Sequence, residues 1–298
     1  MGKLNVSIII PNYNGSQLLR KNLLAVVAAS EYAPNRVLEI IVVDDGSQDN
    51  SVRFLKKNYP AIRLFRHKVN RGFSAAVNTG ARAAKGELII LINSDVIPSK
   101  DFLAPALRLF ENKKVFAVSL HEKGFGWAKG SFSDGFIQLG MGEETPESHS
   151  SFYVSGDSGV FRRKYWIELG GMDEKLLSPF YWEDIDLCYR AEKRGYLNLW
   201  EPEANVIHNH ESTISKLPKS YVQRIKERNQ LLVIWKNIQS PTLIRKHFAG
   251  VFKRVIQHPG YFRIVLMALG KLGIVLKERK KEIKLSSISD EAVFSKFG

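Results

Sequence analysis

Short runs of aliphatic and β-branched residues alternate with amphipathic segments through the first hundred residues of the chain. Continuous apolar runs predict buried strands, whereas apolar positions that recur about every three to four residues predict helices. The predicted strands are Val6–Ile10, Glu39–Val43, Ile62–Phe65 and Glu87–Ile92, and the predicted helices are Gln17–Ala29, Ser51–Asn58 and Ser74–Ala84. Helices that separate apolar strands indicate an α/β fold whose sheet is mostly parallel and carries helices on both faces.

The pattern is less regular in the second half of the chain. Residues 121–151 are rich in Gly, Ser, His and Glu without a clear period, and we expect a mobile excursion over the functional site there. Beyond it we expect a strand at Tyr153–Phe161, a helix from about Arg163, a helix that begins near Trp182 and a strand that leads to His208. We find no internal repeat and no low-complexity segment.

Polar residues follow the predicted strands at their carboxyl ends, where open α/β sheets bind ligands. The Asp44-Asp45 pair fits a tight turn before a helix, and it also fits carboxylates that accept hydrogen bonds from a nucleobase or a ribose. Asp95, after the fourth strand, fits a cap before Pro98 or a ligand of a divalent cation that also holds phosphate oxygens. The residue pattern alone leaves both alternatives open.

Three further positions allow the same two kinds of interpretation. Arg71 and Gly72 fit an ordinary loop, or a place where guanidinium, backbone and the next helix N-terminus attract a negatively charged ligand. Glu183 and Asp184 fit an acidic first helical turn, or a general base beside aromatic residues. His208, directly after an apolar run, fits a structural histidine or a metal ligand.

Taken together, these blocks resemble the family 2 glycosyltransferases of the GT-A fold in their order and spacing. The resemblance rests on Val6–Asn14, Val42–Ser47, Asn70–Phe73, Asn93–Asp95, Leu169–Glu174, Trp182–Asp186 and Arg228-Asn229, and it covers roughly residues 4–237. It implies a Rossmann-like nucleotide-binding sheet and an inverting enzyme that uses a nucleotide-diphosphate sugar. The expected donor is UDP- or dTDP-linked, and the expected acceptor is a glycan or a lipid-linked glycan in polysaccharide biosynthesis.

The resemblance also implies roles for residues on the donor side of the site. The expected donor-binding residues are Pro11, Tyr13, Asp44, Asp45, Arg71, Gly72, Asn93 and Ser94. Asp95 matches the last aspartate of the family's DxD signature and is expected to bind Mn²⁺ or Mg²⁺. The first position of that signature is Asn93 and not Asp, so we expect Asn93 to contact the ribose and not the metal.

On the acceptor side, the resemblance implies that Asp184 is the general base that removes the proton of the acceptor hydroxyl. Asp157, Trp182 and Glu183 are expected to line the acceptor site. A histidine completes the metal shell in many relatives, and His208 and His210 are two candidates for that place. His208 is preferred because it directly follows the apolar run.

The net charge of +14 invites a nucleic-acid interpretation, but its distribution argues against that class of partner. Residues 1–213 carry 26 Lys and Arg against 25 Asp and Glu, whereas residues 214–298 carry 18 against 5. The basic charge therefore belongs to the tail. Because the chain has a single cysteine, Cys188, and no apolar leader after its polar start, we expect a cytoplasmic protein.

The tail contains two apolar segments. In residues 243–256, apolar side chains fall on one helical face and basic side chains on the other, which fits packing on the enzyme's own core or a place in a membrane interface. Tyr261–Leu276 is apolar except for Lys271, and it is shorter than the roughly 20 residues of a spanning helix. We expect peripheral contact with the anionic inner face of the cell membrane.

We therefore expect a GT-A domain over residues 1–215, with a nucleotide-sugar half at 1–100 and an acceptor half at 101–215, followed by a basic helical tail at 216–298. Two other classes compete with a glycosyltransferase. A sugar nucleotidyltransferase would need a Gly-rich, basic phosphate loop after the first strand, which Pro11–Gly15 is not. A non-catalytic, membrane-associated module that binds nucleotide sugars would not need Asp95, Asp184 and His208 together.

Overall fold

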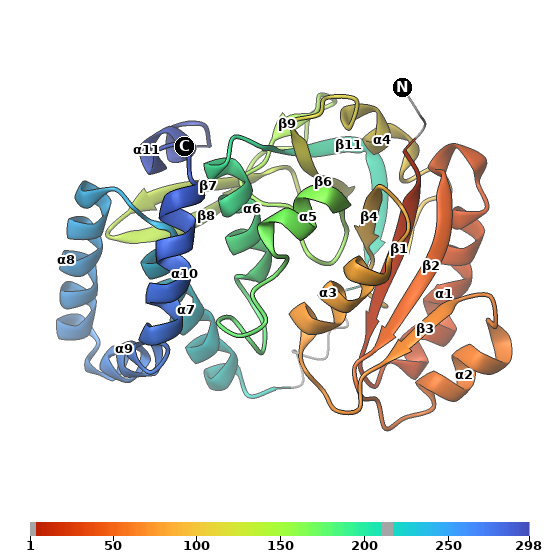
Figure 1. The fold of residues 1–298 in the computed structure, drawn as a ribbon, viewed down its shortest axis with the longest axis horizontal. Coiled ribbons are helices and arrows are strands. Elements are labelled where there is room, and N and C mark those ends of the chain that lie inside the picture. The colour runs from red at the N-terminus through yellow and green to blue at the C-terminus, as the bar shows by residue number, and fades with distance from the viewer. Residues whose placement is uncertain (1–3, 210–216, 298) are drawn as a thin grey trace.

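The computed structural model describes residues 4–209 and 217–297, which form a layered α/β body and a helical extension (Figure 1). In the first half, strands β1 (Val6–Asn12), β2 (Val37–Asp44), β3 (Arg63–Arg66) and β4 (Leu88–Leu91) alternate with helices α1 (Ser16–Ser30), α2 (Ser51–Asn58) and α3 (Phe73–Ala83). A short 3-10 helix, Ala33–Asn35, precedes β2. The strands and helices predicted for this half are confirmed, with ends that differ by a few residues.

The second half of the body contains more strands than helices. Its elements are β5 (Val96–Pro98), α4 (Ala104–Leu109), β6 (Val115–Glu122), β7 (Ala128–Ser133), β8 (Phe136–Met141), β9 (His149–Ser150), β10 (Gly159–Arg162), α5 (Arg163–Leu169), α6 (Glu183–Lys193) and β11 (Leu197–His208). The helices expected near Arg163 and Trp182 and the strand that ends at His208 are confirmed.

The main sheet has the strand order β3-β2-β1-β4-β10-β6-β11-β5, with β9 paired to β11. Strands β1 to β4 pair in parallel, and β6 pairs in parallel with β11. In contrast, β10 is antiparallel to β4 and β6, and β11 is antiparallel to β5 and β9. The sheet is therefore parallel in its first half, as the alternation of strands and helices there predicts, and mixed in its second half.

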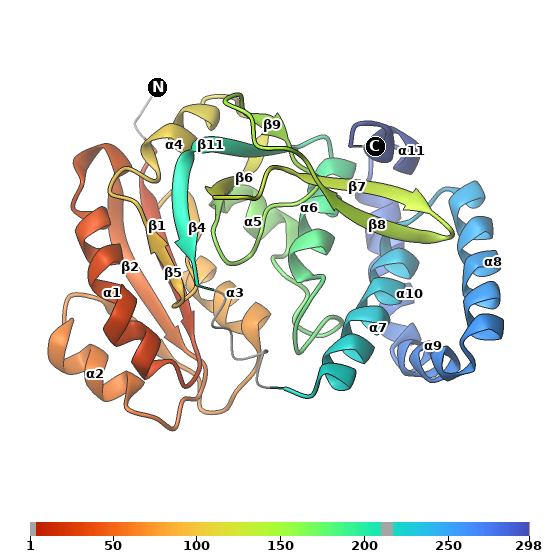
Figure 2. The same cartoon turned by 180° about the vertical axis from the view of Figure 1, so that it is seen from behind.

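Helices cover both faces of the sheet. Ile8 and Ile10 of β1 pack with α1, α2 and α4 in one cluster, whereas Ile9 packs with α3, α5 and α6 in another. Burial on both faces explains why the strands are apolar throughout. Because β1, β2 and β4 run in the same direction, their polar carboxyl ends meet at one edge, the lower edge of the body in Figures 1 and 2.

Two expectations for the second half are wrong. The segment 121–151 is not an irregular excursion, because β7 and β8 pair in an antiparallel hairpin. Its Asp134-Gly135 turn has φ values of 51° and 82°, which two-residue hairpin turns require and which Asp-Gly favours. The strand expected at Tyr153–Phe161 is limited to Gly159–Arg162 because the preceding backbone bonds to scattered partners. Phe152 N–H donates to the Ala128 carbonyl at the start of β7, and the Asp157 carbonyl accepts from Asn93 N–H in the loop after β4.

The helices after residue 217 pack against the second half of the body. They are α7 (Lys219–Asn237), α8 (Pro241–Gln257), α9 (Phe262–Leu269), α10 (Leu272–Leu285) and α11 (Asp290–Ser295), with a 3-10 turn at Pro259–Tyr261. They share one hydrophobic cluster with the β7–β8 hairpin and α6. Within the described residues, no single helix has the length and hydropathy to cross a membrane, although α9 and α10 pass that test together as a pair bent by 67°. The boundary near residue 215 stays a prediction.

Candidate active site

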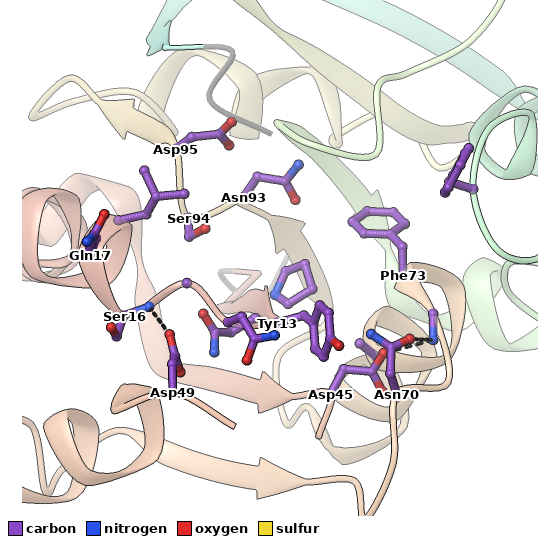
Figure 3. Close-up of a pocket in the computed structure, with 18 of the residues that line it drawn as sticks. Tyr13, Ser16, Gln17, Asp45, Asp49, Asn70, Phe73, Asn93, Ser94 and Asp95 are labelled. Carbon is purple, nitrogen blue, oxygen red and sulfur yellow. Dashed lines mark hydrogen bonds between the residues drawn. The ribbon is translucent and has the colours of Figure 1, made fainter. Parts of the chain in front are cut away.

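A pocket of about 1000 Å³ lies where β1, β2 and β4 end (Figure 3). It is lined by Pro11, Asn12, Tyr13, Asn14, Gly15, Ser16, Gln17, Leu18, Lys21, Asp45, Asp49, Asn70, Gly72, Phe73, Ala76, Asn93, Ser94, Asp95, Pro179, Phe180 and Leu217. Figure 3 shows Tyr13 beside Asp45 and Asn70 on one side, and Ser94 and Asp95 on the other. The structure thus brings most of the expected donor-binding residues together, but Asp44 and Arg71 are not among the lining residues.

Asp45 organises the loop that forms one wall of the pocket. Its carboxylate accepts hydrogen bonds from the backbone N–H groups of Arg71, at 2.9 and 3.0 Å, and Gly72, at 2.8 Å. His67 lies 2.6 Å from the same carboxylate, and its other ring nitrogen lies 3.0 Å from the Thr79 hydroxyl. The left-handed φ of 91° at Gly72 lets the chain turn here directly into α3.

Asp44 holds the neighbouring turn together from beneath. Its side chain is fully buried, and it accepts hydrogen bonds from the Asn12 amide at 3.0 Å and the Ser47 N–H at 3.1 Å. The Ser47 hydroxyl in turn accepts a hydrogen bond from the Asn14 N–H. These contacts connect the ends of β1 and β2. Asp44 therefore influences the pocket indirectly, by fixing the position of the turn.

The Arg71 side chain points to a different partner than the one expected. Its guanidinium lies 3.0 Å from the Glu174 carboxylate, in the loop that follows α5. Glu174 also accepts a hydrogen bond from the Asn78 amide of α3. This pair connects the donor-side loop to the chain that leads towards Asp184.

Asp95 and His208 meet although they come from opposite halves of the sequence. The Asp95 Oδ2 and His208 Nε2 atoms are 3.3 Å apart, because β5 pairs with the end of β11. The other ring nitrogen of His208 lies 3.5 Å from Asp157 and 3.7 Å from Glu122. Burial alone lowers the pKa of His208, but the contact with Asp95 and the charges of Asp157 and Glu122 raise it overall.

The Asp95–His208 pair fits a divalent cation that is completed by ligand oxygens. Carboxylate oxygen and imidazole nitrogen bind such cations at about 2.0–2.2 Å, so two adjacent ligands stand about 3 Å apart. Across residues 4–209 and 217–297, no group of three or more His, Cys, Asp or Glu side chains is arranged to hold a metal ion. The alternative ligand His210 lies outside the described residues.

Asp184 and Glu183 are adjacent carboxylates at the start of α6. Burial raises the pKa of Asp184 to about 6. Hydrogen bonds from the N–H groups of Ile185 and Gly156 lower this pKa, but by less than burial raises it. Burial and the charge of Asp184 raise the pKa of Glu183 further, to about 8. The pKa of Glu183 is raised more than that of Asp184, so Asp184 is the carboxylate of the pair that ionises more readily.

Gly156 places Asp184 beside the pocket. Its N–H lies 3.4 Å from an Asp184 oxygen, and a Cβ at this glycine would stand 3.2 Å from the Phe73 ring, which lines the pocket. Tyr153 lies near both Asp184 and Asp157, since their charges add to burial in raising its pKa. Asp157 thus joins the His208 cluster to the region of the expected base.

The loop before α6 has a constrained backbone. Tyr181 and Trp182 have left-handed φ values of 71° and 76°. Asn229 of α7 donates hydrogen bonds to the carbonyls of Leu177, Phe180 and Tyr181 at 2.6, 3.0 and 2.9 Å. Trp182 is buried in the hydrophobic cluster and does not line the pocket, so it can desolvate the neighbouring carboxylates but presents no face to a sugar there.

Sequence reasoning missed several residues of the pocket. Lys21 and Asp49 line it from α1 and from the loop before α2, and the Ser16 N–H at the start of α1 donates to Asp49. The position of α1 directly after the first polar strand end was the available signal for both. Phe180 and Leu217 also line the pocket, but they are distant in sequence and no local pattern indicates them.

The mixed α/β sheet with a pocket at the carboxyl ends of its parallel strands is the architecture expected for the GT-A fold. Residues 7–170 match the family model described as glycosyl transferase family 2. The chain belongs to this family.

Relatives agree with that assignment. The chain is 30% identical over 218 residues to the pre-mycofactocin glycosyltransferase of Mycobacterium tuberculosis, over 70% of this chain and 44% of that protein. It is 24% identical over 234 residues to the N-acetylglucosaminyl-diphospho-decaprenol L-rhamnosyltransferase of the same species, over 66% and 74%. Against the uncharacterized protein y4gI of Sinorhizobium fredii, the identity is 28% over 70% of this chain and 24% of that protein. The chain thus spans less than half the length of two of these relatives.

Solved structures share the fold. One is GalNAc-T7 with UDP, GalNAc and Mn²⁺, with a TM-score of 0.62 at 16% identity over 87% of this chain and 57% of that chain. Another is the mannosyltransferase PcManGT from Pyrobaculum calidifontis in complex with GDP-Man and Mn²⁺, with a TM-score of 0.58 at 17% identity over 96% and 86%. At these identities the likeness establishes the fold alone.

Proposed function

We propose that this chain is a glycosyltransferase that transfers a sugar from a nucleotide-diphosphate sugar to an acceptor hydroxyl with inversion at the anomeric carbon. The observation that carries the proposal is the position of two chemically different carboxylates, one in the wall of the pocket and one behind that wall. Asp95 lies beside His208 at the pocket wall, and Asp184 lies behind Phe73 with a pKa of about 6. Asp95 suits a role in stabilising the negative charge of a leaving diphosphate, and Asp184 suits the role of a general base near neutral pH.

On the donor side, the nucleoside is expected to lie against Tyr13 and Asp45, with its ribose near Asn93. Asp95 and His208 would hold Mn²⁺ or Mg²⁺, and a bound metal supplies Lewis-acid stabilisation of the negative charge on the leaving diphosphate. The GT-A neighbours solved with Mn²⁺ support this choice. We expect a UDP- or dTDP-linked donor.

On the acceptor side, Asp184 accepts the proton of the attacking hydroxyl while its neighbour Glu183 stays neutral. Asp157 lies between Asp184 and His208, where it would orient the acceptor hydroxyl or the donor sugar. A relative named for a decaprenol-linked acceptor supports a lipid-linked glycan in polysaccharide synthesis as the acceptor class. Cytoplasmic localisation, with contact to the inner face of the membrane, remains part of the proposal.

A panel of nucleotide sugars tests the donor half of this proposal. Melting temperature is measured with UDP-, dTDP- and GDP-linked sugars, each with and without Mn²⁺, because a ligand that binds only the native state raises it. We expect one donor to stabilise the protein only when metal is present. Nucleotide release and the anomeric configuration of the product then test transfer. Retention of configuration, or donor binding without any turnover, would contradict the proposed mechanism.

A further inference from the structure

Exposed apolar side chains gather on the last helices of the chain. About half of the large apolar side chains that are exposed in the described residues fall between positions 248 and 288. On α8 they form one stripe, because Phe248, Phe252 and Ile256 are each four residues apart. On α9, Phe262, Leu266 and Leu269 are four and three residues apart, which also places them on one helical face. We call these six residues the α8–α9 face.

The α8–α9 face is distinct from the side by which the two helices pack on the enzyme. On α8 the opposite side holds the buried residues Leu243 and His247, and on α9 it holds Ile264 and Ala268. The amphipathic helix expected from the sequence therefore has apolar residues on two sides. One side completes the core, and the other has no partner among the described residues.

The charged side chains on the two helices of the α8–α9 face have one sign. Residues 241–270 contain five Lys and Arg and no Asp or Glu. Arg245, Lys246, Lys253 and Arg263 are exposed beside the apolar stripes. Apolar side chains framed by exposed cations are the composition of helices that lie in the interface of an anionic bilayer.

The position of the face relates it to the pocket. In Figures 1 and 2, α9 lies at the same lower edge of the molecule as the carboxyl ends of the strands that form the pocket. Directly after α9, the Lys271 ammonium donates to the carbonyls of Lys175 and Leu176 at 2.7 and 3.0 Å. The same loop continues to Pro179 and Phe180, which line the pocket.

We propose that the α8–α9 face is a peripheral binding surface for an anionic lipid bilayer, and that it turns the pocket towards acceptors held in that bilayer. The second part rests on the proposed function. A second copy of the chain is a poorer occupant, because a twofold contact would bring the same cations together. Partial insertion also agrees with the absence of any single spanning helix among the described residues.

Sedimentation with lipid vesicles tests the surface in the full-length protein. Truncation is unsuitable because Tyr261, Ile264 and Ala268 are buried in the core cluster. The test variant is the double substitution Phe252→Glu and Leu266→Glu, at side chains 69% and 51% exposed. Leu24→Glu on α1, where the leucine is 66% exposed, is the matched control. Melting temperatures identify any variant that fails to fold.

We expect the parent and Leu24→Glu to bind phosphatidylglycerol vesicles, and to bind more weakly as salt increases. The double variant should bind at least about tenfold more weakly, since each buried apolar side chain contributes roughly a factor of ten in partitioning. Parent protein that ignores these vesicles, or a double variant that binds them like the parent, overturns the proposal. A parent dimer that the double variant converts to monomer also overturns it.

Two acceptors separate this proposal from the proposed function. The double variant should lose transfer to an acceptor embedded in vesicles and keep transfer to a water-soluble acceptor with the same glycan. Equal loss with both acceptors contradicts the orienting role. If neither protein transfers sugar to either acceptor while vesicle binding differs as expected, the membrane surface stands and the proposed function fails.

Discussion

The two sides of the pocket are built from very different stretches of sequence. On the donor side, Asp44 and Asp45 make their hydrogen bonds with residues of the first eighty positions, at the ends of neighbouring parallel strands. On the other side, the loop that leads to Asp184 is held by hydrogen bonds from Asn229 of α7, some fifty residues later in the sequence. The donor side is thus fixed by the sheet itself, whereas the base is fixed by a helix that packs against its loop.

The two sides of the pocket also differ in conformational energy, because the loop before α6 contains two residues in the left-handed region. Left-handed φ values at Tyr181 and Trp182 cost of order 1–3 kcal/mol each for residues other than glycine. Asn229 offsets part of this cost with its hydrogen bonds to the loop carbonyls, and Arg228 adds one to the Ser178 carbonyl at 2.7 Å. The last helices therefore have a direct part in the active site as well as in the core.

Replacement of the base should have the largest effect and leave the donor side intact. Asp184→Asn keeps the shape of the side chain but cannot accept a proton, and we expect kcat to fall by about a hundred- to ten-thousandfold. Donor affinity, measured by calorimetry, should change little because Asp184 is not a lining residue of the pocket.

The neighbouring carboxylate gives a matched control for that variant. Burial holds Glu183 in its neutral form near pH 7, and the glutamine in Glu183→Gln resembles that form. We expect kcat within a few-fold of the parent. If Glu183→Gln loses most of its kcat while Asp184→Asn keeps near-parental kcat, Glu183 and not Asp184 is the general base.

Loss of Asp95 or of His208 should give the next largest effect, and it should act on donor affinity, whereas loss of Asp184 acts on kcat. Asp95→Ala and His208→Ala should each weaken donor binding in the presence of Mn²⁺ by about a hundredfold, since even indirect support of a metal ligand is worth about ten- to a hundredfold. Binding without metal should change much less. If His208→Ala binds donor like the parent at limiting Mn²⁺ and His210→Ala does not, the ligand is His210.

The same contrast separates what the sequence could predict from what it could not. The first four strands and the positions of Asp45 and Asp95 follow from local patterns, because apolar strands in parallel must end at one edge. The Asp134-Gly135 hairpin was also predictable, since Asp-Gly is the preferred two-residue turn. It was missed because the segment around it lacks clear alternation.

The rest of the site depends on contacts between distant segments. Nothing in the sequence around Phe180 indicates that this side chain lines the donor pocket, or that Asn229 bonds to its carbonyl. The partner of Arg71 could not be predicted for the same reason, because Glu174 is brought to it only by the packing of the folded loop.

Substitution of Asn229, on the helix that supports the loop before α6, should have a moderate effect on both kcat and donor affinity. In Asn229→Ala the loop carbonyls lose their donor, so we expect kcat to fall by about tenfold and donor affinity to fall with it, because Pro179 and Phe180 line the pocket. Gln223→Ala, on the exposed side of the same helix, is the control. Loss of thermal stability with parental kinetics would assign Asn229 a purely structural role.

The pH dependence of kcat should show the smallest effect and test the same carboxylate without any substitution. Burial raises the pKa of Asp184 to about 6, so the base becomes protonated as the pH falls through that value. Activity should therefore be full above about pH 7, about half at pH 6 and about a tenth at pH 5. The acidic limb of the profile should be absent from the residual activity of Asp184→Asn, since that side chain does not titrate. If the parent keeps full kcat down to pH 4.5 while the protein stays folded, the proton acceptor is not a buried carboxylate of raised pKa, and Asp184 is not the general base.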